Sequence, residues 1–219
     1  MDKLNRHKKL KSALTYWLLG RKYHNALSAL TCAESYHFKD ENGNIRLRKD
    51  KKTPEFFHQI EIALFITTLE PHLTHPEETI CAGLLHAVLE DYNIHPNAIS
   101  CLFDNVDFSV RVYNAVEKLS KINKSNNTKK LINDYFSEIG QDNIASIVKG
   151  IDRINNQQSM VEPFTINKQK EYISETENYI LPALKTAQKL YPVQHMAYES
   201  IKYVLKSQIY LIQQIHITE

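Results

Sequence analysis

The stretch "CAGLLHAVLEDYNI", Cys81 to Ile94, decides how the rest of the chain can be interpreted. It is rich in residues that favour helices, yet it carries a histidine and two adjacent acidic residues. On a helix, His86 and Glu90 lie one turn apart, as do Ala87 and Asp91, so the polar groups share one edge. The solvated face of an amphipathic helix would explain this edge if the stretch stood alone.

The helical spacing of apolar residues recurs along nearly the whole chain, which predicts an all-α fold. Glycine is scarce, with 5 residues in 219, and strand-like alternation is rare. Polar breaks are expected at Lys39–Pro54, Asn123–Thr128 and Ser159–Lys168. The predicted helices are Lys9–Leu19, Tyr23–Tyr36, Glu55–Leu69, Pro76–Asp91, Asn97–Leu102, Ser109–Leu119, Asn127–Ile139, Ile144–Asn156, Lys168–Lys189 and His195–Ile215.

The length and composition favour a single domain with ordinary apolar content and a net charge of only +2. This balance argues against a disordered chain and against a strongly basic surface for nucleic acid. The basic and then apolar N-terminus is interpreted as an amphipathic helix, not a signal peptide, and no apolar run has membrane-spanning length. Three scattered cysteines without a CxxC spacing favour a reducing compartment. We therefore expect a cytoplasmic protein that does not bind membranes or nucleic acid.

Two other predicted helices carry polar residues on apolar faces. In "TPEFFHQIEIALFITTL", His58 shares a stripe with Ile62 and Phe65, so it points toward the core. A single core-facing histidine is more often a hydrogen-bonded structural residue than a ligand. In "IASIVKGIDRINNQQS", Asp152 lies one turn after Val148, again on a face with apolar residues.

Taken together, these positions suggest a shared partner for His58, His86 and Asp152. An isolated buried carboxylate is costly unless something positive pairs with it. Imidazole and carboxylate are suitable ligands for a divalent cation. One such ion would satisfy all three side chains at once, which makes a metal site the preferred interpretation.

The segments that carry these residues resemble the HD-domain metal-dependent phosphohydrolases, and among them the alarmone hydrolases of the RelA/SpoT type and their small stand-alone relatives. The family patterns are close to TPYxxHP, LLHDxxED and KLADRxxN. Here "RKDKKTPEFFH", "GLLHAVLED" and "VKGIDRINN" match them in the same order, while "ALSALTCAESYH" and "KEYI" are similar to two other helices of the family. The resemblance covers residues 23–190. It implies an HD-domain helical bundle with additional C-terminal helices in residues 191–219, which either pack on the domain or form an oligomer surface.

Carried over position by position, the resemblance implies that His58, His86 and Asp152 bind a divalent metal, with Mn²⁺ the expected ion. Glu90 and Asp91 match the acidic pair that positions or deprotonates the attacking water. These five residues form the expected metal and catalytic set.

The resemblance also implies a set of substrate contacts. Arg48 and Lys49 match a basic pair, Asn156 and Ser159 match polar contacts, and Tyr172 matches a late aromatic residue. Each has a simpler explanation that stays open: a solvated charged loop for the basic pair, a helix-end cap for Asn156 and ordinary helix packing for Tyr172.

The function implied by the resemblance is metal-dependent hydrolysis of the 3′-pyrophosphate of ppGpp or pppGpp, which gives GDP or GTP and pyrophosphate. The expected ligand is therefore guanosine tetraphosphate or pentaphosphate. No segment suggests an alarmone synthetase domain, so we expect a stand-alone hydrolase. Short proteins of this family can scavenge alarmones or act as antitoxins against a toxic alarmone synthetase, and a homo-oligomer is also possible.

Two positions depart from the family pattern. Ala87 replaces the aspartate of the HD pair, and Gln158 stands where arginine is usual. Alanine offers no oxygen to a metal, so we expect impaired activity. Because the other polar residues of the pattern are present, we interpret Ala87 as an engineered Asp→Ala inactivation, with natural loss as the alternative; an alanine codon in the native gene would contradict the first.

Two other functions remain open. Gln158 and the long "ENGNIRLR" segment before Lys49 allow a different substrate, such as an adenosine alarmone, another nucleotide or NADPH. If Ala87 is native, the chain could instead be a catalytically inactive nucleotide sensor or an antitoxin-like interaction protein.

Overall fold

The computed structural model describes residues 3–92, 97–120 and 129–218. Within these residues it contains helices and two isolated β-bridges but no β-strand, so the predicted all-α fold is confirmed. No helix in the described part is both long and apolar enough to span a membrane. The α-helices are α1 (Lys3–Arg21), α2 (His24–His37), α3 (Phe57–Leu69), α4 (Pro76–Leu85), α5 (Val88–Tyr92), α6 (Asn97–Ser100), α7 (Val106–Leu119), α8 (Lys129–Gly140), α9 (Ala145–Met160), α10 (Ile166–Glu175), α11 (Leu181–Leu190) and α12 (His195–Thr218). Short 3₁₀ turns cover Glu70–His72 and Pro192–Gln194, and a π-helical turn covers Thr176–Ile180.

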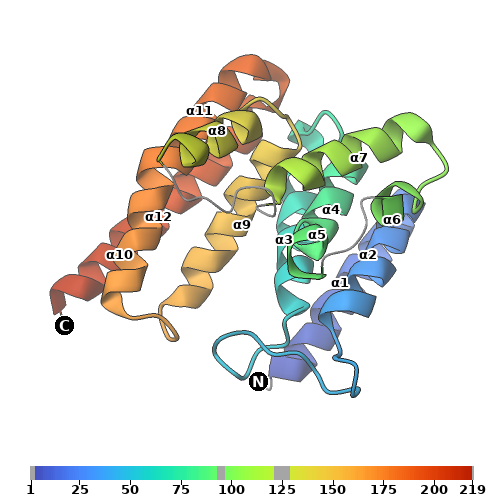
Figure 1. Ribbon diagram of the computed structural model, residues 1–219, viewed down its shortest axis with the longest axis horizontal. Helices are drawn as coiled ribbons and strands as arrows, with labels where there is room; N and C mark the ends of the chain where they lie inside the picture. The colour runs from blue at the N-terminus through green and yellow to red at the C-terminus, as the bar shows by residue number, and fades with distance from the viewer. Residues whose placement is uncertain (1–2, 93–96, 121–128, 219) are drawn as a thin grey trace.

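Helix α9 runs between the two sides of the bundle (Figure 1). Helices α1 to α7 gather on one side of it, and α8, α10, α11 and α12 lie on the other. Helix α9 contacts α3 and α4 on one side and α12 on the other. The helices that carry His58 and Asp152 therefore pack directly against each other.

Two glycines allow close helix contacts around α9. A Cβ atom on Gly83 of α4 would lie 2.6 Å from Cδ1 of Ile66 in α3. A Cβ atom on Gly150 of α9 would lie 2.6 Å from Cγ2 of Ile201 in α12. Because real Cβ atoms do not approach other atoms so closely, a larger residue at either position would force the facing isoleucine to shift.

The predicted helix Pro76–Asp91 is wrong as a single element, because the chain leaves the helix at His86 and Ala87. The Gly83 carbonyl, which a continuous helix would offer to the Ala87 N–H, accepts a hydrogen bond of 2.8 Å from Nδ1 of His86. The side chain of His86 thus competes with the helix backbone at the point where α4 ends.

The predicted helix Lys168–Lys189 also differs, because a π-helical turn separates α10 from α11. The Leu181 N–H donates to the Thr176 carbonyl, five residues earlier. Pro182 follows and has no N–H with which to continue the α-helical pattern. The local proline explains why the regular helix is interrupted.

Other boundaries shift by a few residues. Helix α1 begins earlier than predicted, and α7 begins at Val106, where Oδ1 of Asn105 accepts from the Phe108 N–H. Helix α9 continues to Met160, so the connection expected at Ser159–Lys168 is shorter. The predicted break Asn123–Thr128 lies outside the described residues.

Helix α12 packs along α9, which is one of the two arrangements expected for residues 191–219. Its residues Tyr198, Ile201 and Leu205 are fully buried and belong to the main hydrophobic core. The Tyr198 hydroxyl also lies 2.9 Å from Oγ of Ser146 at the start of α9. This packing supports α9 from the side opposite α3.

Candidate metal centre and adjoining pocket

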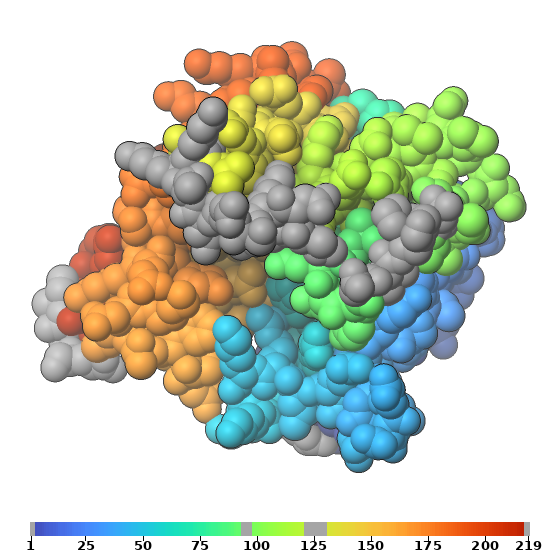
Figure 2. Space-filling view, viewed as in Figure 1, coloured from blue at the N-terminus to red at the C-terminus, as the bar shows by residue number. Residues whose placement is uncertain are grey.

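A cavity of about 860 Å³ opens beside α9. Figure 2 shows the hollow between the cyan segment that precedes α3, green α5 and the orange segment after α9. The structure brings most of the sequence-predicted site residues to its lining: Arg48, Lys49, His58, Ala87, Glu90, Asp91, Asn156, Ser159 and Tyr172. Residues far apart in the sequence therefore share one pocket.

The three expected metal ligands meet at the inner side of this pocket. One nitrogen or oxygen atom from each of His58, His86 and Asp152 lies within 4.8 Å of the others. Nε2 of His58 is 3.2 Å from Oδ1 of Asp152, and Nε2 of His86 is 3.9 Å from the same oxygen. The triad is built by α3, by the turn after α4 and by α9.

In both imidazoles of the triad, the ring nitrogen that does not face Asp152, Nδ1, is hydrogen-bonded to a protein oxygen. Nδ1 of His86 lies 2.8 Å from the Gly83 carbonyl, and Nδ1 of His58 lies 2.7 Å from Oδ1 of Asn155. Carbonyl and amide oxygens only accept hydrogen bonds, so each Nδ1 carries the proton. In the neutral rings, each Nε2 therefore presents a lone pair toward Asp152.

The triad consequently gathers three electron-rich atoms in a largely buried place. Burial lowers the pKa of His86 to about 4, so this ring is neutral near pH 7. Burial alone would raise the pKa of Asp152, but the ammonium group of Lys149 holds it well below its usual range. Two lone pairs facing a carboxylate favour a cation between them, and the donor set suits a divalent transition metal.

Lys149 is a neighbour of this centre that the sequence analysis missed. Its buried Nζ lies 3.2 Å from Oδ2 of Asp152 and 5.8 Å from the ring centroid of Tyr135. Lys149 thus holds the carboxylate oxygen that does not face the histidines. The signal was available, since a buried carboxylate needs a positive partner and Lys149 lies three residues before Asp152.

Ala87 lies in the break between α4 and α5 and lines the pocket. It follows His86 directly, so an aspartate at this position would add a carboxylate to the lining beside the triad. Alanine contributes no ligand atom there. The three-residue group therefore gains no fourth side-chain ligand from this position.

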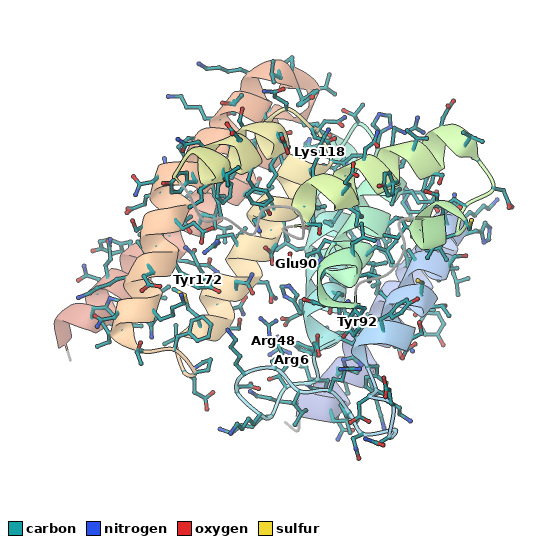
Figure 3. The ribbon with its side chains drawn as sticks, viewed as in Figure 1. Arg6, Arg48, Glu90, Tyr92, Lys118 and Tyr172 are labelled. Atoms are coloured by element: carbon teal, nitrogen blue, oxygen red, sulfur yellow. The ribbon has the colours of Figure 1, made fainter. Side chains whose placement is uncertain are left out.

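Glu90 and Asp91 both come from α5 and line the pocket. Figure 3 shows Glu90 facing the side of the bundle from which Tyr172 comes, with Arg48 below them in this view. Burial raises the pKa of Asp91, with Glu90 and Glu55 adding to the shift and His37 opposing it. A carboxyl group with a raised pKa is suited to accept a proton near neutral pH.

Asp91 also belongs to a second group that the sequence analysis missed, with His37 and Glu55. Their candidate ligand atoms again lie within 4.8 Å of one another. Nδ1 of His37 is 3.3 Å from Oε1 of Glu55, and the Tyr92 hydroxyl donates to the same oxygen at 3.3 Å. Burial would raise the pKa of Glu55, but its contacts with His37 and Tyr92 and the charge of Arg46 together outweigh this and lower it.

The structure holds Arg48 against α9 instead of leaving it solvated in its loop. Its guanidinium donates to Oδ1 of Asn155 at 3.0 Å, to Oδ1 of Asn156 at 3.2 Å and to Oγ of Ser159 at 3.1 Å. Burial lowers the pKa of Arg48, and nearby carboxylates oppose the shift, so the group stays charged. Lys49 is exposed, with Nζ 4.9 Å from the ring centroid of Phe164.

The other polar and aromatic candidates also lie around this arginine. Asn156 is not a helix-end cap, because α9 continues beyond it and its amide donates to Oδ1 of Asp152 at 2.7 Å. Tyr172 packs edge to face on Phe164 with ring centroids 5.3 Å apart. The Cζ atom of Arg153 lies 4.6 Å from the Tyr172 ring centroid, so this tyrosine has a packing role as well as a place at the pocket edge.

The described lining of the pocket carries more negative than positive groups. Asp50, Glu55, Glu61, Glu90, Asp91 and Glu162 supply six carboxylates, whereas Lys3, Arg6, Arg48 and Lys49 supply four basic groups. An anionic ligand would meet repulsion from this excess unless a cation offset it. The excess of carboxylates around the pocket is therefore consistent with a cation bound by the triad.

Comparison with known proteins gives one informative match. No family model matches the chain. Over 129 residues, or 52% of the chain, it is 30% identical to the probable guanosine-3′,5′-bis(diphosphate) 3′-pyrophosphohydrolase of Synechocystis sp.. The chain is a distant homologue of that protein. It spans only 17% of the length of that relative, so the match supports hydrolase ancestry and leaves the reaction of this chain to be proposed.

Proposed function

We propose that this chain has the site of a metal-dependent alarmone hydrolase, which removes the 3′-pyrophosphate of ppGpp or pppGpp. The observation that carries the proposal is the pair of Nε2 atoms of His58 and His86 that face one carboxylate oxygen of Asp152. The distant homology to a guanosine-3′,5′-bis(diphosphate) 3′-pyrophosphohydrolase supports the choice of substrate.

In this proposal, His58, His86 and Asp152 hold a divalent cation, with Mn²⁺ the preferred ion. Such an ion supplies Lewis-acid activation of water and of a phosphate oxygen. Asp91 accepts the proton of the attacking water, in keeping with its raised pKa, while Glu90 helps to orient that water.

Substrate binding would use the groups around Arg48. The guanidinium of Arg48 and the ammonium of Lys49 neutralise the polyphosphate. Asn156 and Ser159 accept hydrogen bonds from Arg48, and in this proposal they contact the same phosphates. Tyr172 borders the pocket and offers an aromatic face to the nucleoside.

The Ala87 position is expected to impair turnover in this chain. Without a carboxylate there, the centre has three side-chain ligands and less negative charge to hold an ion. A first experiment compares pyrophosphate release from ppGpp with added Mn²⁺ by this chain and by Ala87→Asp. Turnover by Ala87→Asp, with little or none by the unchanged chain, is the expected result.

Failure of a folded, metal-loaded Ala87→Asp chain to release pyrophosphate from ppGpp would exclude this substrate. Gln158 favours one alternative, because it lines the pocket where the family pattern has arginine. Hydrolysis of an adenosine alarmone or NADPH by Ala87→Asp would identify that alternative.

Ala87 itself favours the second alternative, a nucleotide-binding protein without turnover that acts as a sensor or as an antitoxin. Binding of ppGpp without hydrolysis, before and after Ala87→Asp, would identify it. Co-purification of an alarmone synthetase would then distinguish the antitoxin from the sensor.

A further inference from the structure

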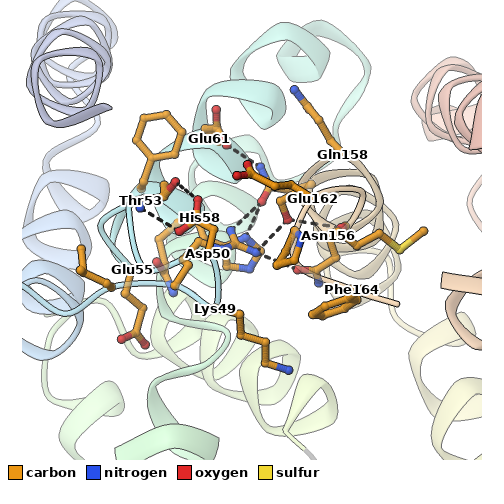
Figure 4. A pocket seen from close by; sticks show the side chains of 18 of the residues that line it. Lys49, Asp50, Thr53, Glu55, His58, Glu61, Asn156, Gln158, Glu162 and Phe164 are labelled. Atoms are coloured by element: carbon orange, nitrogen blue, oxygen red, sulfur yellow. Dashed lines mark hydrogen bonds between the residues drawn. The ribbon is translucent and has the colours of Figure 1, made fainter. Parts of the chain in front are cut away.

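The side chain of Asn155 connects three parts of the site, because it contacts His58, Arg48 and Glu61. Figure 4 labels two of these partners, His58 and Glu61. Oδ1 of Asn155 lies 2.7 Å from Nδ1 of His58 and accepts a hydrogen bond of 3.0 Å from Arg48. Its Nδ2 donates to Oε2 of Glu61 at 2.7 Å. Asn155 is only 6% exposed, so each of these bonds replaces contact with water.

The neighbours of Asn155 fix which way its amide faces. Arg48 has only N–H donors, and the Glu61 carboxylate has only acceptors. A flipped amide would place its NH₂ group against the Arg48 donors and its oxygen against the Glu61 carboxylate, and both contacts would be repulsive. Oδ1 must therefore face Arg48 and His58.

This orientation determines the tautomer of His58. Because Oδ1 of Asn155 only accepts, Nδ1 of His58 is the donor, and the lone pair of the neutral ring is on Nε2. Without Asn155, the proton could move to Nε2, which lies 3.2 Å from Oδ1 of Asp152. A direct hydrogen bond between them would then occupy the position that a cation needs.

We propose that Asn155 is a positioning residue that keeps His58 in its metal-binding tautomer, with Glu61 orienting Asn155. The identity of the bound ion rests on the proposed function, whereas the tautomer does not. A ligand histidine is commonly fixed by a hydrogen bond to its second nitrogen. Arg48 shares the same oxygen, so the expected phosphate-binding group and the metal ligand are held by one side chain.

The test measures the His58 tautomer and the Mn²⁺ affinity separately. Nitrogen-15 NMR of the metal-free chain, at a pH well above the ordinary imidazole pKa of about 6.5, reports which ring nitrogen is protonated. We expect Nδ1–H in the unchanged chain and Nε2–H in Asn155→Ala. Mn²⁺ titration should show a loss of affinity of about 10–100-fold in Asn155→Ala.

Ser159→Ala is the matched control, because it also removes a hydrogen bond to Arg48 but touches neither His58 nor Glu61. It should keep the Nδ1–H tautomer and the original Mn²⁺ affinity. If Asn155→Ala does not fold, Glu61→Ala removes the partner of the Asn155 amide from a less buried position and should weaken Mn²⁺ binding in the same direction.

A double substitution tests whether the same hydrogen bonds can be restored with the carboxylate and the amide exchanged between positions 155 and 61. In Asn155→Asp with Glu61→Gln, the new carboxylate accepts from His58 and Arg48, and the new amide at position 61 donates to it. This variant should restore the Nδ1–H tautomer and most of the Mn²⁺ affinity. Nε2–H in the unchanged chain, or an unchanged tautomer and affinity in folded Asn155→Ala, would overturn the proposal.

The result is independent of alarmone hydrolysis. A tautomer shift in Asn155→Ala, together with no turnover of ppGpp by Ala87→Asp, would support the role of Asn155 and reject the proposed substrate. Turnover of ppGpp by Ala87→Asp, together with no tautomer shift in Asn155→Ala, would support the proposed substrate and reject the role of Asn155.

Discussion

Two groups in this molecule contain histidine and carboxylate atoms within 4.8 Å of one another, but their hydrogen bonds differ. In the triad of His58, His86 and Asp152, each imidazole donates from Nδ1 to an oxygen outside the group. In the second group, His37 instead directs Nδ1 to the Glu55 carboxylate inside the group. Proximity alone therefore does not identify a metal site, because the choice of nitrogen decides whether a cation is required.

The charges around the two groups follow the same distinction. In the second group, His37 and the Tyr92 hydroxyl both satisfy Oε1 of Glu55, and the Cζ atom of Arg46 lies 5.3 Å from the Tyr92 ring centroid. These contacts of the Glu55 carboxylate lower its pKa. In the triad, Lys149 contacts the far oxygen of Asp152, whereas the near oxygen accepts a hydrogen bond from the Asn156 amide and also faces Nε2 of both histidines.

The largest expected effect is on metal binding. His86→Gln should weaken Mn²⁺ binding by more than about 100-fold, since even residues that only orient a ligand account for 10–100-fold. His37→Gln, a matched change in the second group, should leave the affinity unchanged. Titration with Mn²⁺ followed by electron paramagnetic resonance measures both, and a comparable loss in folded His37→Gln would break the distinction.

The next effect is on stability in acid, in the absence of metal. The His86 pKa of about 4 in the folded chain is below the ordinary value of 6.5, so the unfolded chain binds the proton first as the pH falls. Stability is therefore lost from pH 6.5 downward, by about 2 kcal/mol on reaching pH 5. Urea unfolding of the unchanged chain and of His86→Gln measures this loss. The difference between their unfolding free energies should fall by this amount between pH 6.5 and pH 5, and a difference that stays constant would contradict the prediction.

A smaller gain is expected from Ala87→Asp, which adds a carboxylate beside the triad. Mn²⁺ affinity should rise on the order of tenfold, because affinity for a cation increases with the number of charged ligands. Ala87→Asn, which has nearly the same shape without the charge, is the control and should gain less. Equal affinities for all three chains would place the ion elsewhere.

The smallest effect is expected in the second group. Glu55→Gln should change the unfolding free energy at neutral pH by less than about 1 kcal/mol, because the pair with His37 is partly exposed. The lowered pKa of Glu55 means that its contribution is present above the ordinary pKa and is lost as the pH falls through the folded value. Urea unfolding of both chains at neutral and acid pH tests this, and loss of Mn²⁺ binding in Glu55→Gln would contradict an ion-pair role.

The sequence predicted the helices from apolar spacing, but it did not predict where they break. The interruption after Leu85 depends on the His86 side chain reaching the Gly83 carbonyl, and periodicity carries no sign of that contact. The π-helical turn before Pro182 could have been predicted from the missing N–H of that residue. The burial of α12 against Gly150 depends on distant packing.

The site was predicted less completely than the fold. His58, His86 and Asp152 were predicted to share a partner because buried polar groups need one, and the structure brings these three side chains together. Asn155 was missed because it lies next to Asn156, and only the fold shows that one amide contacts His58 while the other contacts Asp152. The second group was missed because His37 and Glu55 lie in segments with no recognisable spacing.

The most direct test of the account is the location of bound Mn²⁺ in a crystal, from its anomalous scattering. We predict a single strong peak between Nε2 of His58, Nε2 of His86 and Oδ1 of Asp152, with no comparable peak at His37 and Glu55. A peak at the second group with none at the triad would contradict it.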